Sequence, residues 1–298
     1  MKKRVGMHSG YFRDTPLEQN VFKIVQSIYE AGGNAVEFMP AQLFSLSSAQ
    51  RTEFRSLLEM LDMELIIGAG RSPSTDPSNP DPQIQKSSYK FAEQVLQLLY
   101  ELGCHKWDGL IHACWPGHPD GTLTTKRKAS ILSLSAENMR HLMPLAEKYQ
   151  IDFCFEVVNR FEHYLLNTAS EALGFCDMIN NPHAKILLDV FHMNIEENDI
   201  SEAILMTGKA GKLGHFHVGE ANRSVPCTVP SHIDWEKIFD SLKNSGYDGT
   251  VILEPFIIGG APYSSNVCLW RDLTQNASFE KYLDYMKTGI SFIKNLWL

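Results

Sequence analysis

Short apolar segments alternate with longer helical patterns along the whole chain, and this rhythm constrains the fold more than any other feature. The segments are rich in β-branched and aromatic residues, as buried strands are, and they recur about every 30 to 45 residues. Eight are found, at 4–10, 35–39, 64–70, 108–115, 152–158, 185–191, 214–220 and 250–256. Eight strands that are each followed by a helix predict a (β/α)₈ TIM barrel, formed as a single domain over residues 1–298.

Apolar residues at helical spacing fill the intervals between these segments. Pro16 suits a first helical turn, and the pattern that follows it ends at Gly32 and Gly33. The predicted helices cover 17–33, 47–62, 85–103, 128–149, 168–180, 200–208, 234–246 and 279–297.

An open, doubly wound sheet is the second architecture that this alternation allows. Such a sheet would carry a glycine-rich phosphate loop after an early strand, and neither GxGxxG nor GxxxxGK[ST] occurs in the chain. The segment 71–83 is rich in Pro, Ser and Asp, but it directly follows the third strand. In a barrel it is therefore a loop on the catalytic face and not a boundary between domains.

Charge and composition narrow the functional class. The chain has 298 residues, 44% of them hydrophobic, and a formal charge of −8 without a basic block, so we expect neither nucleic acid nor membrane as a partner. The start is basic but lacks the apolar stretch of a signal peptide, and no run is long enough to span a bilayer. The six cysteines have no disulfide-framework spacing. Reduced thiols in the cytoplasm are the simplest interpretation.

One residue of metal-ligand type stands near the end of each of the last four predicted strands. These residues are Glu156, Asp189, His217 and Glu254, separated by 33, 28 and 37 residues, each close to one strand-and-helix unit. Because the carboxyl ends of barrel strands meet at one mouth, we expect the four side chains to converge there.

Three converging carboxylates would repel one another, and a divalent cation removes that conflict. Oxygen ligands with one imidazole suit Mn²⁺ or Mg²⁺, although Co²⁺ or Zn²⁺ could occupy the same cage.

Each of the other polar residues near these strand ends can be interpreted either as part of the site or as an ordinary structural residue. His215 lies one layer deeper than His217 on the same face, and a hydrogen-bonded histidine supporting the site is its better interpretation. His192 and Arg223 lie just after predicted strands, where each is either a substrate contact or a solvated residue. The aromatic residues near strand ends form either core or an apolar wall for a small ligand; they are Phe12, Trp115, Phe256 and Trp270.

Several long motifs resemble the ketose 3-epimerases, the family of D-tagatose 3-epimerase and D-allulose (psicose) 3-epimerase, within the xylose-isomerase-like barrels. The motifs are FEVVNRFEHYLLNT, LLDVFHMNIEE, GHFHVGEANR, YDGTVILEPF and LWRDLT, and they are densest between residues 151 and 273. The resemblance covers nearly the whole chain.

The resemblance implies one divalent metal per chain, most often Mn²⁺ and otherwise Co²⁺ or Mg²⁺, and a homodimer or homotetramer. The family's metal ligands match Glu156, Asp189, His217 and Glu254, the set that strand spacing also indicates. Its two catalytic glutamates, which exchange the proton at carbon 3 of a ketose through an enediolate, match Glu156 and Glu254. Its substrate-holding residues match Glu162, His192 and Arg223.

The chain departs from the family around the mouth. His8 stands where many relatives have an aromatic residue, His112 is more polar than usual, and the segment after Arg223 is different. We expect these positions to shape the pocket around C4 to C6 of the sugar, and we expect His8 and Trp115 to contact the substrate. D-allulose/D-fructose, D-tagatose/D-sorbose and L-ribulose/L-xylulose remain open as substrates. The alternative functions are an aldose–ketose isomerase, a metal-dependent endonuclease and a non-catalytic sugar-binding barrel.

Overall fold

The computed structural model describes residues 2–68, 70–262, 264–265 and 267–298, and it confirms the barrel. Eight parallel strands pair in chain order and close between the last and the first. The strands are β1 (Arg4–His8), β2 (Ala35–Phe38), β3 (Glu64–Gly68), β4 (Lys106–Gly109), β5 (Asp152–Val157), β6 (Ala184–Asp189), β7 (Leu213–Val218) and β8 (Thr250–Leu253).

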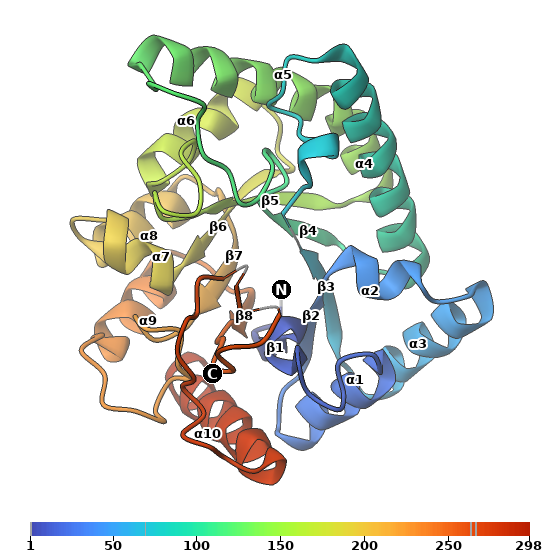
Figure 1. Cartoon of the computed structure of the whole chain (residues 1–298), viewed down its shortest axis with the longest axis vertical. Helices are drawn as coiled ribbons and strands as arrows, with labels where there is room; N and C mark the ends of the chain where they lie inside the picture. The colour runs from blue at the N-terminus through green and yellow to red at the C-terminus, as the bar shows by residue number, and fades with distance from the viewer. Residues whose placement is uncertain (1, 69, 263, 266) are drawn as a thin grey trace.

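The helices form an outer ring around these strands (Figure 1). They are α1 (Val21–Glu30), α2 (Pro40–Phe44), α3 (Ser48–Met60), α4 (Pro82–Leu102), α5 (Thr125–Tyr149), α6 (Ala169–Ile179), α7 (Val190–Glu196), α8 (Ile200–Lys209), α9 (Trp235–Asn244) and α10 (Phe279–Trp297), with 3₁₀ turns η1 (Ser9–Phe12) and η2 (Pro73–Thr75). The short helices α2 and α7 were not predicted. Within the described part of the chain, none of the helices combines the length and the apolar character needed to cross a bilayer.

Two predicted boundaries are wrong for local reasons. The first helix begins at Val21 and not after Pro16, because the Asn20 side chain accepts a hydrogen bond from the Lys23 amide and caps the helix there. The fourth strand covers Lys106–Gly109 and not 108–115. Gly109 takes a φ of +92°, which is not a strand conformation and which ends the ladder.

The interior of the barrel changes from apolar to polar along its axis. A separate cluster of buried apolar residues is formed by Ala35, Ile66 and Ile252. Ala35 and Glu37 lie two residues apart on β2 and therefore face the same side of the sheet, as do Ile252 and Glu254 at the end of β8. The apolar layer thus supports the polar residues that lie nearer the carboxyl ends of the strands.

Candidate active site and metal centre

A cavity of about 270 Å³ opens at the carboxyl ends of the strands. Apolar side chains, among them Trp115 and Phe256, form part of its wall. The rest of the lining is rich in titratable groups, which are His8, Glu37, Glu156, Glu162, His192, His217, Arg223 and Glu254. Seven of these titratable residues, all except Glu37, are predicted ligands or substrate contacts. The structure therefore places them in one cavity, together with the predicted contact Trp115.

The four residues predicted as metal ligands converge. Each of Glu156, Asp189, His217 and Glu254 offers one ligand atom, and these atoms all lie within 4.8 Å of one another. Asp189 is the last residue of β6, and its Oδ1 accepts a hydrogen bond from the Phe191 amide at 2.9 Å, which caps α7. Its other oxygen is left to face the centre.

The His217 ring is oriented by a carboxylate behind it. Its Nε2 donates to Oε2 of Glu37 at 2.8 Å. Nδ1 lies 3.7 Å from Oε2 of Glu254 and has no hydrogen-bond partner among the residues described. Burial disfavours the charged ring, but Glu37 and Glu254 outweigh it and raise the pKa of His217, so the ring is charged when no cation is bound. A cation that displaced the Nδ1 proton would meet a lone pair directed at the carboxylates of the cage. A carboxylate that is hydrogen-bonded to the far ring nitrogen, as Glu37 is to Nε2, commonly supports a metal-binding histidine.

The carboxylates of the cage are electrostatically strained without a cation. Burial and the nearby Glu254 raise the pKa of Glu156 well above its ordinary value. Burial opposes the ionisation of Glu254 too, but the His217 ring and the Arg223 guanidinium outweigh it and hold the pKa of Glu254 at about 2. A divalent ion would relieve the repulsion between these groups, so the residues present fit such an ion.

Arg223 links the cage to the substrate-contact residues. Its Nη1 donates to Asp189 Oδ2 at 3.3 Å and to Glu254 Oε2 at 3.0 Å, and its Nη2 donates to Glu162 Oε1 at 3.3 Å. The guanidinium lies 3.7 Å from the ring centre of Phe191, a stacking contact that holds its plane. Burial disfavours the charge, yet Glu254 and the other carboxylates raise the pKa of Arg223, which stays charged.

His192 and Glu162 present complementary groups to the cavity. His192 Nδ1 accepts hydrogen bonds from the Asn159 amide at 3.1 Å and from the Asn159 side chain at 2.8 Å. The ring proton is therefore on Nε2, which lies 3.7 Å from Oε1 of Glu156. Burial lowers the pKa of His192, so the neutral ring is a hydrogen-bond donor. The indole of Trp115 donates to Oε2 of Glu162 at 2.9 Å and holds that carboxylate in place.

His8 also reaches the cavity as a donor. Its Nδ1 accepts from the Gly10 amide at 3.0 Å, which leaves the proton on Nε2. That nitrogen lies 3.6 Å from Oε1 of Glu37, and the ring packs edge-on against Phe256.

Three residues considered for the pocket lie elsewhere. His112 is buried, packs against Phe155 and Phe175 and does not line the cavity, so the expectation that it shapes the pocket is wrong. Phe12 is fully buried in the core, whereas Trp270 is 74% exposed. Of the four aromatic residues proposed as an apolar wall, only Trp115 and Phe256 belong to it.

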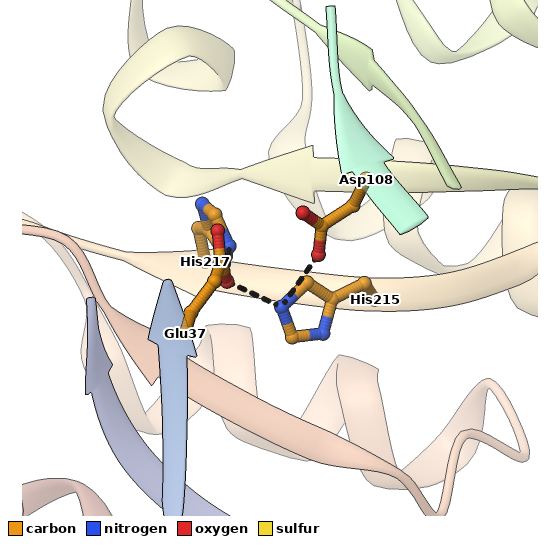
Figure 2. Close-up of side chains that lie close together, drawn as sticks. All are labelled: Glu37, Asp108, His215 and His217. Atoms are coloured by element: carbon orange, nitrogen blue, oxygen red, sulfur yellow. Dashed lines mark hydrogen bonds and ion pairs between the residues drawn. The ribbon is translucent and has the colours of Figure 1, made fainter. Parts of the chain in front are cut away.

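Sequence reasoning missed Glu37 and Asp108. Both carboxylates are buried on the inner face of the barrel beside His215 and His217 (Figure 2). The signal for Glu37 was present in the segment AVEFM, where a carboxylate interrupts an apolar strand just as Glu156 interrupts β5. His215, predicted to support the site from one layer deeper, donates to Glu37 Oε2 at 3.0 Å.

Comparisons of the sequence and of the structure with known proteins all indicate the same family. Residues 25–287 match the family described as the xylose isomerase-like TIM barrel. The D-psicose 3-epimerase of Ruminiclostridium cellulolyticum is 37% identical over 260 residues, which cover 87% of this chain and 86% of that protein. The L-ribulose 3-epimerase of a Methylomonas species is 31% identical, with 80% of each chain covered.

A solved structure of the D-psicose 3-epimerase of Clostridium cellulolyticum with D-tagatose is similar over the whole barrel. It superimposes with a TM-score of 0.91 at 32% sequence identity, covering 98% of this chain and 99% of that one.

Proposed function

This chain belongs to the ketose 3-epimerases of the xylose isomerase-like TIM barrel family, and we propose that it inverts carbon 3 of a free ketose in a reaction that depends on a divalent metal. The observation that carries the proposal is the placing of Glu156 and Glu254 in one cage with Asp189 and His217. Candidate substrates are the pairs D-fructose/D-allulose, D-tagatose/D-sorbose and L-ribulose/L-xylulose.

Glu156, Asp189, His217 and Glu254 would hold the metal. Three carboxylates and one imidazole favour Mn²⁺, with Co²⁺ or Mg²⁺ as substitutes. When bound, the cation would act as a Lewis acid on the sugar oxygens and stabilise the charge that develops next to the C2 carbonyl.

The two glutamates carry the proton exchange. Glu156 is the next-to-last residue of β5 and Glu254 directly follows β8, so the carboxylates enter the cavity from strands three places apart around the ring. One carboxylate takes the proton from C3 on one face of the sugar, and the other returns a proton to the opposite face. The result is inversion at C3 through an enediolate.

Three further groups hold and stabilise the reacting end of the sugar. The Nε2–H of His192 and the guanidinium of Arg223 donate hydrogen bonds, and both are fixed from behind, by Asn159 and by Phe191. Glu162, fixed by Trp115, accepts a hydrogen bond from a sugar hydroxyl. Donors that are already oriented stabilise a developing oxyanion without reorganising during the reaction. His8, with Trp115, contacts the distal end of the sugar.

Isotope exchange tests the reaction. The protein loaded with Mn²⁺ is incubated with D-allulose and with L-ribulose in D₂O, and the products are followed by NMR. Deuterium at C3 with formation of the C3 epimer is expected. Deuterium at C1 or C2 would instead establish an aldose–ketose isomerase, and no exchange would leave a sugar-binding barrel.

Two variants test the assignment of the glutamates. Glu156→Gln and Glu254→Gln each remove one proton carrier while preserving size, and we expect turnover to fall below detection in both. Metal content is measured in parallel, because each residue is also assigned as a ligand. Near wild-type activity in either variant would contradict this assignment.

A further inference from the structure

A second group of potential metal ligands lies deeper in the barrel than the cage. Glu37 on β2, Asp108 on β4, and His215 and His217 on β7 each offer a ligand atom within 4.8 Å of the others. Each of these residues is at most 2% exposed. His217 takes part in both groups, with Nε2 toward Glu37 and Nδ1 toward Glu254. We call Glu37, Asp108 and His215 the inner cluster (Figure 2).

The spacing of the inner cluster is that of a coordination shell. His215 Nε2 lies 3.0 Å from Glu37 Oε2, to which it donates when no ion is bound, and 3.4 Å from Asp108 Oδ2. On binding an ion, the ring proton would move to Nδ1, which has no hydrogen-bond partner among the described residues. Ligand atoms that are each held about 2.1 Å from one ion lie roughly 3.0 to 3.4 Å apart in octahedral or tetrahedral geometry. Both separations agree with three atoms arranged around one divalent ion.

Asp108 is the observation that points to a ligand. Its side chain is fully buried, and neither of its carboxylate oxygens has a hydrogen-bond partner among the described residues. The contact of Oδ2 with His215 lacks hydrogen-bond geometry, since that ring also faces Glu37. A buried carboxylate without donors is strongly disfavoured unless a proton or a metal ion satisfies it.

The backbone leaves room for this carboxylate. A Cβ built on Gly68, the last residue of β3, would lie 1.7 Å from Oδ1 of Asp108 and 2.8 Å from Oε1 of Glu37. Glycine at this position therefore allows the two carboxylates to occupy the space beside the strand.

The excess of negative charge at the base of the cavity favours the binding of a second cation. Six carboxylates surround it, from Glu37, Asp108, Glu156, Glu162, Asp189 and Glu254. Arg223 supplies one positive charge and an ion in the cage would supply two, which leaves three negative charges for protons or a further cation to balance.

We propose that Glu37, Asp108 and His215 bind a second divalent metal ion beneath the cage. Two carboxylates and one imidazole suit Mn²⁺, Co²⁺ or Zn²⁺. Glu37 and Gly68 line the cavity, so an ion that enters the mouth can reach the cluster. Each carboxylate oxygen has two lone pairs, so Glu37 Oε2 can bind the ion while it still accepts the hydrogen bond from His217.

Metal counting tests this site and needs no enzymatic activity, so its outcome is separate from that of the epimerase test. The protein is stripped with a chelator and titrated with Mn²⁺ in a calorimeter, and bound metal is counted by mass spectrometry after desalting. We expect two ions per chain in the wild type and one in Asp108→Asn. Glu254→Gln, which alters only the cage, is the matched control and should also bind one ion.

Electron paramagnetic resonance gives an independent readout. Two neighbouring Mn²⁺ ions in the wild type should give a broadened, spin-coupled spectrum, whereas Asp108→Asn should give the spectrum of an isolated ion. His215→Gln provides a second variant of the inner cluster if the first does not fold. One ion per chain in the wild type, with an unchanged count in the folded inner-cluster variant, would overturn the proposal and leave a proton shared by Asp108 and Glu37.

Discussion

We predict that Glu37 governs how strongly the cage binds a metal ion, although it is not one of the four proposed cage ligands. Its carboxylate accepts the Nε2–H of His217 at 2.8 Å and so directs the Nδ1 lone pair into the cage. Glu37→Gln keeps the shape and an acceptor but removes the negative charge. A hydrogen bond to a charged group contributes about 1.5–3 kcal/mol, and loss of such a carboxylate behind a metal-binding histidine weakens metal affinity about 10- to 100-fold.

The assay follows epimerisation as a function of free Mn²⁺. We expect the half-saturating Mn²⁺ concentration of Glu37→Gln to rise about 10- to 100-fold, the shift that 1.4 kcal/mol per factor of ten gives. Asp108→Asn is the comparison, because it alters the inner cluster but leaves the Glu37–His217 bond intact, and its shift should be much smaller. Equal shifts in both variants, or none in Glu37→Gln, would refute the role given to this hydrogen bond.

Three further outcomes follow from single contacts. Trp115→Phe removes the donor to Glu162 and should lower kcat/KM about tenfold, since one hydrogen bond to a charged group is lost; the mutant's steady-state kinetics with its preferred ketose check this. Burial lowers the pKa of His163 to about 4, so the unfolded chain binds the proton first as pH falls and stability should drop by about 3 kcal/mol between pH 6.5 and 4; urea unfolding should show a flatter pH dependence in His163→Asn. Gly68→Ala places a Cβ against Asp108 and should destabilise the fold by about 1–3 kcal/mol, measured as a lower urea midpoint, and an unchanged midpoint would contradict the described packing.

The barrel was predictable because its signal repeats. Each strand is buried on both faces and therefore appears in the sequence as a run of apolar residues. A helical pattern separates each run from the next. The fourth strand was misplaced because Leu110, Ile111 and Ala113 are buried although they follow the strand. Burial of a loop produces the same apolar pattern as burial of a strand, and the positive φ of Gly109 cannot be read from composition.

The cage was easier to find than the inner cluster for a related reason. Asp189 and His217 lie at or next to the ends of β6 and β7, so counting along the predicted strands placed them at the mouth. Asp108 was assigned to the beginning of a predicted strand, whereas it is the next-to-last residue of β4. The direction and depth of a strand side chain depend on the strand's bounds, so an error of a few residues hid the contact between Asp108 and His215.

The two halves of the barrel contribute unequally to the cavity. All four proposed cage ligands lie on or directly after β5 to β8, beyond residue 150, whereas Glu37, which is hydrogen-bonded to one of them, comes from β2. A fragment that contained only the second half would carry every donor atom for the metal but not the carboxylate that fixes the His217 ring. If Glu37 supports the centre as we predict, metal affinity would report on the docking of separately expressed halves, because the second half would bind the ion tightly only after the first half had closed against it.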